Sequence, residues 1–185
     1  MIYFIADTHF GHEAAIEFSN RPFRDAAEMN FVMMANWNAR VKPDDDIYIV
    51  GDFWFQGGHR YNHEVAMDFI RKLNGNKYLV IGNHDKRPLS YPEFSNEFVD
   101  IADIMKIKHD GQRVILCHYP MLEWEGGRRE AWHIHGHIHG RKEDTFHCLR
   151  NMERALNAGA EIVGYMPVTF EELVQYNAVH KSTVI

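Results

Sequence analysis

The sequence contains five short apolar runs, and each is followed within two residues by side chains that can bind a metal ion. The runs are rich in β-branched and aromatic residues, which predicts buried strands at residues 2–6, 47–50, 77–81, 112–117 and 131–135. The carboxyl ends of strands in an open α/β sheet share one edge, where ligand sites form. Side chains more than a hundred positions apart are therefore expected to meet. The candidates are Asp7 and His9, Asp52, Asn83 to Asp85, His118, and His137 with His139.

Between these runs the apolar pattern changes to a helical period. Residues 25–41 carry apolar side chains on adjoining turns, and residues 61–73 indicate a second helix. Asp110 and Gly111 predict a tight hairpin between residues 104–109 and 112–117, and residues 145–149 indicate a further strand. Thr169 and Glu172 have the spacing of a capping box that opens a final helix. Alternation early and hairpins later predict an α/β fold with one mixed sheet or two sheets.

Length and composition limit the class of protein. At about 150 residues per domain, 185 residues predict one domain spanning residues 1–185. The net charge of −6 argues against a chain that coats nucleic acid, because such binding needs many cations. No apolar run reaches the ~18 residues of a membrane helix, and the first residues lack a secretory signal, so we expect a cytoplasmic protein. Cys117 and Cys148 are expected to be buried thiols without a disulfide framework.

The chemistry of the donors narrows the kind of ion. Seven of the candidates combine two aspartates, one asparagine and four histidines, with no thiolate. This mixture favours manganese, iron or zinc over calcium or copper(I). Seven ligands are too many for one ion with open positions, whereas two ions that share a carboxylate fit.

Each motif taken alone also has an ordinary structural explanation. Asp7 to His9 can begin a loop, the segments around Asp52 and Asn83 can be turns, and His118 can be a core histidine with satisfied hydrogen bonds. The pair His137 and His139, preceded by glycine, suits chelation better than the others. The occurrence of all five, each after a predicted strand, favours one shared site over five unrelated loops.

Together these motifs resemble the signature of the calcineurin-like metallophosphoesterases, in the order of that family. The stretches THFGH (residues 8–12) and NRPF (residues 20–23) are similar to a small bacterial and phage branch. The resemblance implies a four-layer α-β-β-α sandwich, with two mainly mixed sheets flanked by helices and metals at the strand ends. It also implies a first ion held by Asp7, His9, Asp52 and His139, and a second held by Asp52, Asn83, His118 and His137, with Asp52 bridging.

The resemblance also implies roles for neighbouring residues. His84 is expected near the leaving-group oxygen, as proton donor or charge stabiliser, and Asp85 is expected to orient it. The run from His133 to His139 holds two overlapping His-x-His pairs. We assign the later pair as ligands because the family pattern has glycine directly before the first one, which leaves His135 behind the ligands and His133 in strand packing.

Basic residues suggest where a phosphate-bearing substrate could bind. The pairs at residues 86–87, 128–129 and 141–142 flank the predicted metal edge, and arginine matches phosphate oxygens; solvated loop charge is the alternative. His12 and Arg21 follow the first ligand pair. The candidate substrate contacts are His12, Arg21, Arg87, His135 and Arg141.

The sequence thus predicts a dinuclear, metal-dependent hydrolase of phosphate esters that acts by in-line attack of a metal-bridging hydroxide. Mn²⁺ is the favoured ion, with Fe, Zn, Ni or Co as alternatives. A phosphodiesterase for nucleotides or other small diesters is favoured, because a short chain lacks insertions that build a deep pocket. The alternatives are a phosphomonoesterase, a nuclease, or a non-catalytic metal-binding scaffold or sensor; the last class is disfavoured because no ligand is missing. Nucleic acid is the less favoured partner, a membrane is not expected, and the oligomeric state is left open.

Overall fold

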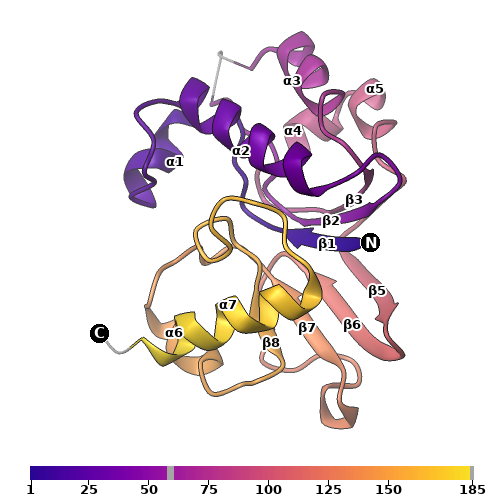
Figure 1. Cartoon of the computed structure of the whole chain (residues 1–185), viewed down its shortest axis with the longest axis vertical. Helices are drawn as coiled ribbons and strands as arrows, with labels where there is room; N and C mark the ends of the chain where they lie inside the picture. The colour runs from indigo at the N-terminus through magenta and orange to yellow at the C-terminus, as the bar shows by residue number, and fades with distance from the viewer. Residues whose placement is uncertain (58–60, 184–185) are drawn as a thin grey trace.

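The computed structural model describes residues 1–57 and 61–183, which form two four-stranded sheets flanked by helices (Figure 1). The expected α/β architecture is therefore present. The first sheet is wholly parallel, so the expectation of mixed sheets holds for the second sheet alone. In order, the first sheet contains β1 (Ile2–Ile5), β2 (Asp46–Val50), β3 (Asn76–Val80) and β4 (Asp100–Ala102).

The second sheet begins with the predicted hairpin and continues with two parallel strands. Asp110 and Gly111 form the turn of this hairpin, and both have a positive φ. The antiparallel pair is followed by parallel pairing that places Ile134 beside Leu116 and Leu156. The strands, in order, are β5 (Ile104–His109), β6 (Gln112–Cys117), β7 (Trp132–His135) and β8 (Ala155–Asn157).

The helices lie on the outer sides of the two sheets (Figure 1). Helix α7 contacts β8 and also β1, and α6 lies beside it, with Phe146 5.0 Å from the ring of His180. None of the described helices has the length and apolar character of a membrane span. The helices are α1 (Glu13–Phe18), α2 (Ala26–Arg40), α3 (His63–Ile70), α4 (Lys86–Leu89), α5 (Pro92–Ser95), the 3-10 helix η2 (Gly127–Arg129), α6 (Asp144–Leu149) and α7 (Phe170–Ser182).

The longest predicted helix, α2, has an N-terminal cap and a regular apolar face, and both can be read from its sequence. The Asp25 carboxylate caps α2 by accepting from the Glu28 amide, and Met29, Met33 and Trp37 recur every four residues on its buried face. At the other end of the chain, Thr169 and Glu172 make the expected capping box at the start of α7.

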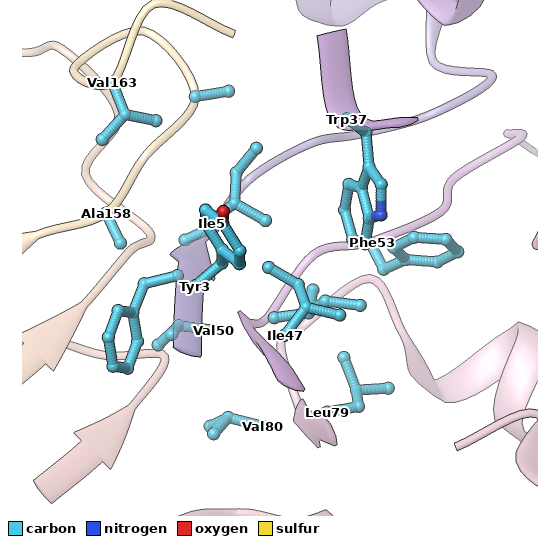
Figure 2. Close-up of a cluster of buried hydrophobic side chains, with 14 of the residues drawn as sticks. Tyr3, Ile5, Trp37, Ile47, Val50, Phe53, Leu79, Val80, Ala158 and Val163 are labelled. Carbon is cyan, nitrogen blue, oxygen red and sulfur yellow. The ribbon is translucent and has the colours of Figure 1, made fainter. Parts of the chain in front are cut away.

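The core follows from the alternation of side chains along the strands. Ile5, Ile47 and Leu79 are almost completely buried, and Trp37 of α2 belongs to the same cluster of buried side chains (Figure 2). The other face of the same sheet carries Phe4, which is also buried. Both faces of the first sheet are therefore covered, which is the requirement for a wholly parallel sheet.

Residues 145–149 are not the strand that the sequence predicted, because they belong to helix α6. The buried residues of this segment are Phe146 and Leu149, three positions apart, which is helical spacing. A five-residue apolar segment is too short to distinguish the two-residue period of a strand from the 3.6-residue period of a helix. Cys148 lies on the outer side of α6 and is exposed, whereas Cys117 is half-buried; the expectation of two buried thiols was wrong.

Candidate metal centre

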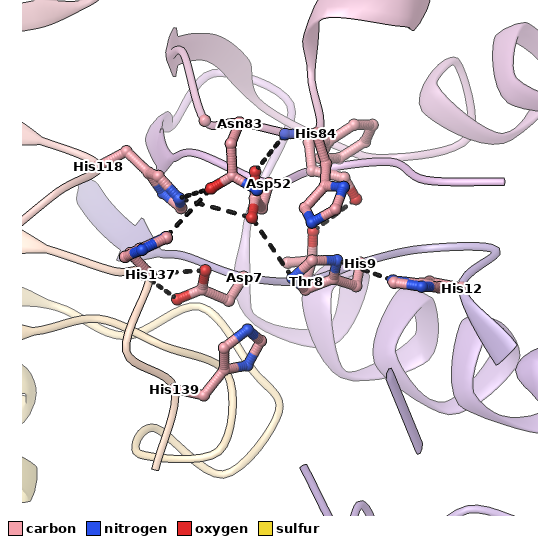
Figure 3. Close-up of polar contacts among 12 residues, drawn as sticks. Asp7, Thr8, His9, His12, Asp52, Asn83, His84, His118, His137 and His139 are labelled. Carbon is pink, nitrogen blue, oxygen red and sulfur yellow. Dashed lines mark hydrogen bonds and ion pairs between the residues drawn. The ribbon is translucent and has the colours of Figure 1, made fainter. Parts of the chain in front are cut away.

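The predicted ligands follow neighbouring strands whose register is aligned. Ile5 pairs with Ile49, and Val50 pairs with Val80, so the loops after β1, β2 and β3 leave the sheet at the same edge. The loops after β6 and β7 join them, since the Gly136 amide donates to the His118 carbonyl. Figure 3 shows the resulting cluster, in which the other five predicted ligands lie around Asp7 and Asp52.

Backbone conformation marks the same residues. Five of the seven predicted ligands have a positive φ between 49° and 71°, a region that non-glycine residues seldom adopt. Strained backbone of this kind persists where the surrounding structure requires it, and it is common at functional sites. The five are Asp7, His9, Asp52, His137 and His139.

Two glycines are required by close approach of ligand side chains. A Cβ atom on Gly82 would collide with the Asp52 carboxylate, and one on Gly136 would collide with the Asp7 carboxylate. The glycine that precedes Asn83 and the one that precedes His137 therefore leave room for two carboxylates.

Asp52 lies at the centre of the cluster. Its Oδ2 atom is 3.5 Å from His9 Nε2 and also 3.5 Å from His118 Nε2. Its Oδ1 atom accepts from the main-chain amide of His84 at 2.8 Å. One carboxylate oxygen thus faces imidazoles from two different loops, as expected for a bridging ligand.

The donors form overlapping groups. Besides the set of His9, Asp52 and His84, two sets consist of predicted ligands alone. Asp7, His9 and His139 offer ligand atoms within 4.8 Å of one another, and so do Asp7, Asp52 and His118. Within the second region, Asn83 Oδ1 is 3.2 Å from His118 Nε2 and 3.0 Å from His137 Nδ1. The structure therefore brings all seven predicted ligands together.

Burial and charge at this edge favour a cation. Burial is the main cause that raises the pKa of Asp7, and although His139 and His118 lower this pKa, the net value is about 6. Burial lowers the pKa of His118, but its hydrogen bond with Asp52 and the charge of Asp7 outweigh this effect and raise that pKa to about 9. The negative potential that holds a proton on His118 also attracts a divalent cation.

A buried ring nitrogen without a hydrogen-bond partner also indicates that the site can hold a divalent ion. His9 Nε2 is buried and has no hydrogen-bond partner among the described residues, which is costly for a polar atom. Coordination of an ion would satisfy it. The donors are carboxylate and amide oxygens and imidazole nitrogens, which suit a divalent metal ion.

Asp85 does not orient the His84 ring, contrary to the sequence-based expectation. Its carboxylate is buried and accepts from the main-chain amides of Asp52, Phe53 and Gly82, each at 2.8 Å. Asp85 thereby joins the loop after β2 to the loop after β3. Its pKa is raised to about 6, mainly by burial and then by the nearby Asp52.

Arg21 is not a substrate contact either. It is 4% exposed, and its guanidinium donates to the main-chain carbonyls of Asp7 and Thr8 and pairs with Glu161. A guanidinium with these internal partners supports the loop after β1 from behind.

Glu161 is a residue of the site that sequence reasoning missed. Its Oε1 atom is 3.1 Å from His139 Nδ1, and its side chain is 9% exposed. Burial raises its pKa, but the hydrogen bond with His139 and the charge of Arg21 outweigh burial and lower it to about 2. Glu161 follows β8 by four residues, as the predicted ligands follow other strands. It could have been found in the same way, but the sequence pattern did not reveal β8.

The remaining candidates for substrate contacts divide into two groups. His135 is 2% exposed and points into the fold, where its Nδ1 contacts the Gly136 carbonyl, so it cannot reach a substrate. His12 is half-buried beside the ligands, with its Nδ1 3.2 Å from His9 Nδ1. Arg141 is exposed and lines a cavity with His137, and Arg87 is exposed at the start of α4, with its guanidinium over Tyr61.

The basic pair Arg128 and Arg129 does not flank the metal edge. Both residues belong to η2, which only Glu130 and Ala131 separate from the start of β7. They line a cavity with Arg113, near the start of β6. The start of β6 and β7 is the edge opposite to His118 and His137, so the three basic pairs do not form one rim.

Comparison with known families agrees with this geometry. The model of the calcineurin-like phosphoesterase family matches residues 1–159. The chain belongs to the calcineurin-like phosphoesterase family. Membership supports hydrolysis of phosphate esters as its general activity and implies divalent metal ions as cofactors.

Similar proteins come from an archaeon and from a mycobacterial phage. The chain is 31% identical over 178 residues to an uncharacterized protein of Methanocaldococcus jannaschii, covering 94% of this chain and 89% of that protein. It is 26% identical over 164 residues to the gene 66 protein of Mycobacterium phage D29, covering 76% and 79%.

Solved structures show the same fold. A protein of unknown function from Aquifex aeolicus superposes with a TM-score of 0.71 at 30% identity, covering 95% of this chain and 98% of that one. A novel archaeal phosphodiesterase superposes with a TM-score of 0.50 at 18% identity, covering 93% and 94%. At that lower identity the likeness concerns the fold.

Proposed function

We propose that the protein is a phosphodiesterase with two divalent ions in its active site. The observation that carries this proposal is the position of Asp52, whose Oδ2 lies 3.5 Å from imidazole nitrogens on both sides. A carboxylate that faces two groups of donors is suited to bridging two ions. In this proposal the first ion is held by Asp7, His9, Asp52 and His139, and the second by Asp52, Asn83, His118 and His137.

Two bound divalent ions would supply Lewis acidity toward the phosphoryl oxygens and would lower the pKa of a bound water. Mn²⁺ is the ion that we propose, because the donors are oxygen and imidazole without thiolate. Side chains of the protein hold the metal ligands in position. Asp85 fixes the two loops that carry Asp52 and Asn83, and Glu161 fixes the ring of His139.

His84 is placed to assist departure of the leaving group. Its ring is half-buried and lies 5.2 Å from the ring of His9, while its main-chain amide holds Asp52. The ring therefore borders the metal centre without being enclosed by it. We assign it the donation of a proton to the leaving oxygen, or stabilisation of its charge.

A diester is favoured over a monoester because cavities adjoin the centre on two sides. One, of about 740 Å³, is lined by His12 and Phe55. The other, of about 250 Å³, is lined by His137 and Arg141. Figure 3 shows His12 and His137 at opposite ends of the ligand cluster. A phosphodiester carries a group on each side of phosphorus, and each cavity can receive one of them.

The test compares bis(p-nitrophenyl) phosphate with p-nitrophenyl phosphate. The protein is freed of metal with a chelator and then reconstituted with Mn²⁺, Fe²⁺, Zn²⁺, Ni²⁺ or Co²⁺. We expect kcat/KM for the diester to exceed that for the monoester, with no turnover before reconstitution. A higher rate on the monoester would assign the protein as a phosphomonoesterase. Stoichiometric metal with no turnover of either ester would favour a binding role.

A further inference from the structure

The larger of the two cavities, which His12 and Phe55 line, has polar and acidic side chains in its walls. It lies between α1, the start of α2 and the segment that follows β2, and its volume of about 740 Å³ is in the range of small-molecule sites. The residues that matter are His12, Glu13, Glu17, Asn30, Phe55 and Gln56.

This cavity begins beside the group that we assign to the leaving oxygen. The Phe55 ring lies 4.4 Å from the ring of His84 and 4.3 Å from the ring of His12. Phe55 and His12, which line the cavity, therefore also border His84. A leaving alcohol next to His84 would therefore lie beside two rings that line this cavity.

Binding of an ion by His9 would set the tautomer of His12. If His9 binds an ion through its orphaned Nε2, its neutral ring carries the proton on Nδ1. That proton is donated to His12 Nδ1, 3.2 Å away. The His12 proton then lies on Nε2, on the other side of its ring, where it can bind a hydroxyl oxygen.

The other polar groups suit a neutral ligand. Asn30 Oδ1 accepts from the Gly11 amide and Gln56 Oε1 accepts from the Asn62 amide, which leaves both side-chain NH₂ groups as donors. Glu17 is exposed on α1, and its carboxylate has no hydrogen-bond or ion-pair partner among the described residues, whereas the Glu13 carboxylate accepts from the Ala26 amide. Lysine and arginine are absent from the part of the lining that the structure describes.

We propose that this cavity receives the leaving alcohol of the diester and selects an uncharged one, a polyol or a nucleoside, over an alcohol that carries a carboxylate or phosphate. An anionic group here would lie beside the carboxylates of Glu13 and Glu17 without a described counter-charge, and repulsion would disfavour it. Hydroxyl groups, in contrast, find amide and imidazole donors and carboxylate acceptors. This inference rests on the proposed phosphodiesterase activity and specifies its substrate class.

The test uses two diesters that differ in the charge of one leaving group. Methyl 4-carbamoylphenyl phosphate and methyl 4-carboxyphenyl phosphate have leaving groups of nearly equal size. The ratio of their kcat/KM values is measured for the wild type and for Glu17→Gln and Glu17→Lys. Comparing this ratio between variants removes the difference in intrinsic reactivity. Glu143→Gln is the matched control, because Glu143 is an exposed carboxylate that lines the cavity on the other side of the centre.

We expect Glu17→Gln to reduce the preference for the carbamoyl ester by about threefold and Glu17→Lys by about tenfold, as befits one partly screened charge. Glu143→Gln should leave the ratio unchanged. The inference is overturned if the Glu17 variants hydrolyse both esters with the wild-type ratio, or if Glu143→Gln shifts the ratio equally. Failure of reconstituted wild type to hydrolyse bis(p-nitrophenyl) phosphate would instead remove the proposed function, and the inference with it.

Discussion

Arg21 and Glu161 form a buried ion pair behind the first group of predicted ligands, with Arg21 Nη2 2.7 Å from Glu161 Oε1. The same carboxylate oxygen contacts Nδ1 of His139, and the guanidinium also holds the main chain of Asp7. A carboxylate on Nδ1 fixes the tautomer of a histidine and turns Nε2 toward a metal. The pair therefore couples the loops after β1, β7 and β8 in one arrangement.

This arrangement makes Glu161 a positioning residue whose charge can be tested. Glu161→Gln preserves the size of the side chain but removes the charge that orients His139 and balances Arg21. We expect Mn²⁺ to bind about 10–100-fold more weakly, as for other residues that support metal ligands. Isothermal titration of the metal-free protein measures this change.

Loss of stability could also weaken metal binding, so a control variant is needed. Trp37→Phe removes a partly buried hydrogen bond from Trp37 Nε1 to the Asn74 carbonyl, which precedes β3 and so lies far from the ligands that follow the strands. Both variants are expected to lower the free energy of unfolding by about 1–3 kcal/mol. Equal metal affinity in Glu161→Gln and Trp37→Phe would show that Glu161 has no specific role.

The bridging position of Asp52 predicts a distinct stoichiometry. Asp52→Asn keeps an oxygen for the His84 amide but loses the charge shared by the two groups of donors. We expect it to bind neither ion at a Mn²⁺ concentration that saturates the wild type, whereas His139→Ala should lose one ion. Equilibrium dialysis followed by elemental analysis gives the counts. Two retained ions in Asp52→Asn would contradict the bridge; the exposed carboxylate Asp100, changed to Asn, is the control.

The place of His84 at the border of the centre predicts a defect in turnover rather than in metal content. His84→Ala should lower kcat for a diester with an alkyl leaving group by about 10²–10⁴-fold, because such alkoxides need a proton. The p-nitrophenyl ester, whose leaving group is stable as an anion, should lose less. Elemental analysis should still find the wild-type metal content. A variant depleted of metal would show that His84 is itself a ligand.

The ligands could be predicted from sequence because each follows a strand, and strand ends are local features of the apolar pattern. The residues that hold those ligands could not. Asp85 bonds to main-chain amides, and Arg21 to main-chain carbonyls, from other parts of the chain, so their contacts depend on tertiary structure. Glu161 was hidden because β8 has only three residues, Ala155–Asn157, and resembles the small-residue loop that follows it.

The buried ring of His133 predicts that the protein loses stability in mild acid. Burial lowers the pKa of His133 to about 4, and its Nε2 accepts from the Met121 amide, an arrangement that protonation would break. In the unfolded chain this pKa is about 6.5. The unfolded state therefore binds one more proton between pH 6.5 and pH 4, and folding weakens as the pH falls through this interval, by about 3 kcal/mol in total.

Urea unfolding between pH 7.5 and pH 4.5, with chelator present throughout, measures this dependence. The wild type is compared with His133→Gln, whose side-chain oxygen can still accept from the Met121 amide but does not titrate. Above pH 7 the two free energies of unfolding should change in parallel, because His133 is neutral in both states. Below pH 6.5 the free energy of unfolding of the wild type should decrease more steeply than that of His133→Gln, by up to about 1.4 kcal/mol for each pH unit. Parallel curves over the whole range would contradict the prediction that burial keeps His133 neutral in the folded protein.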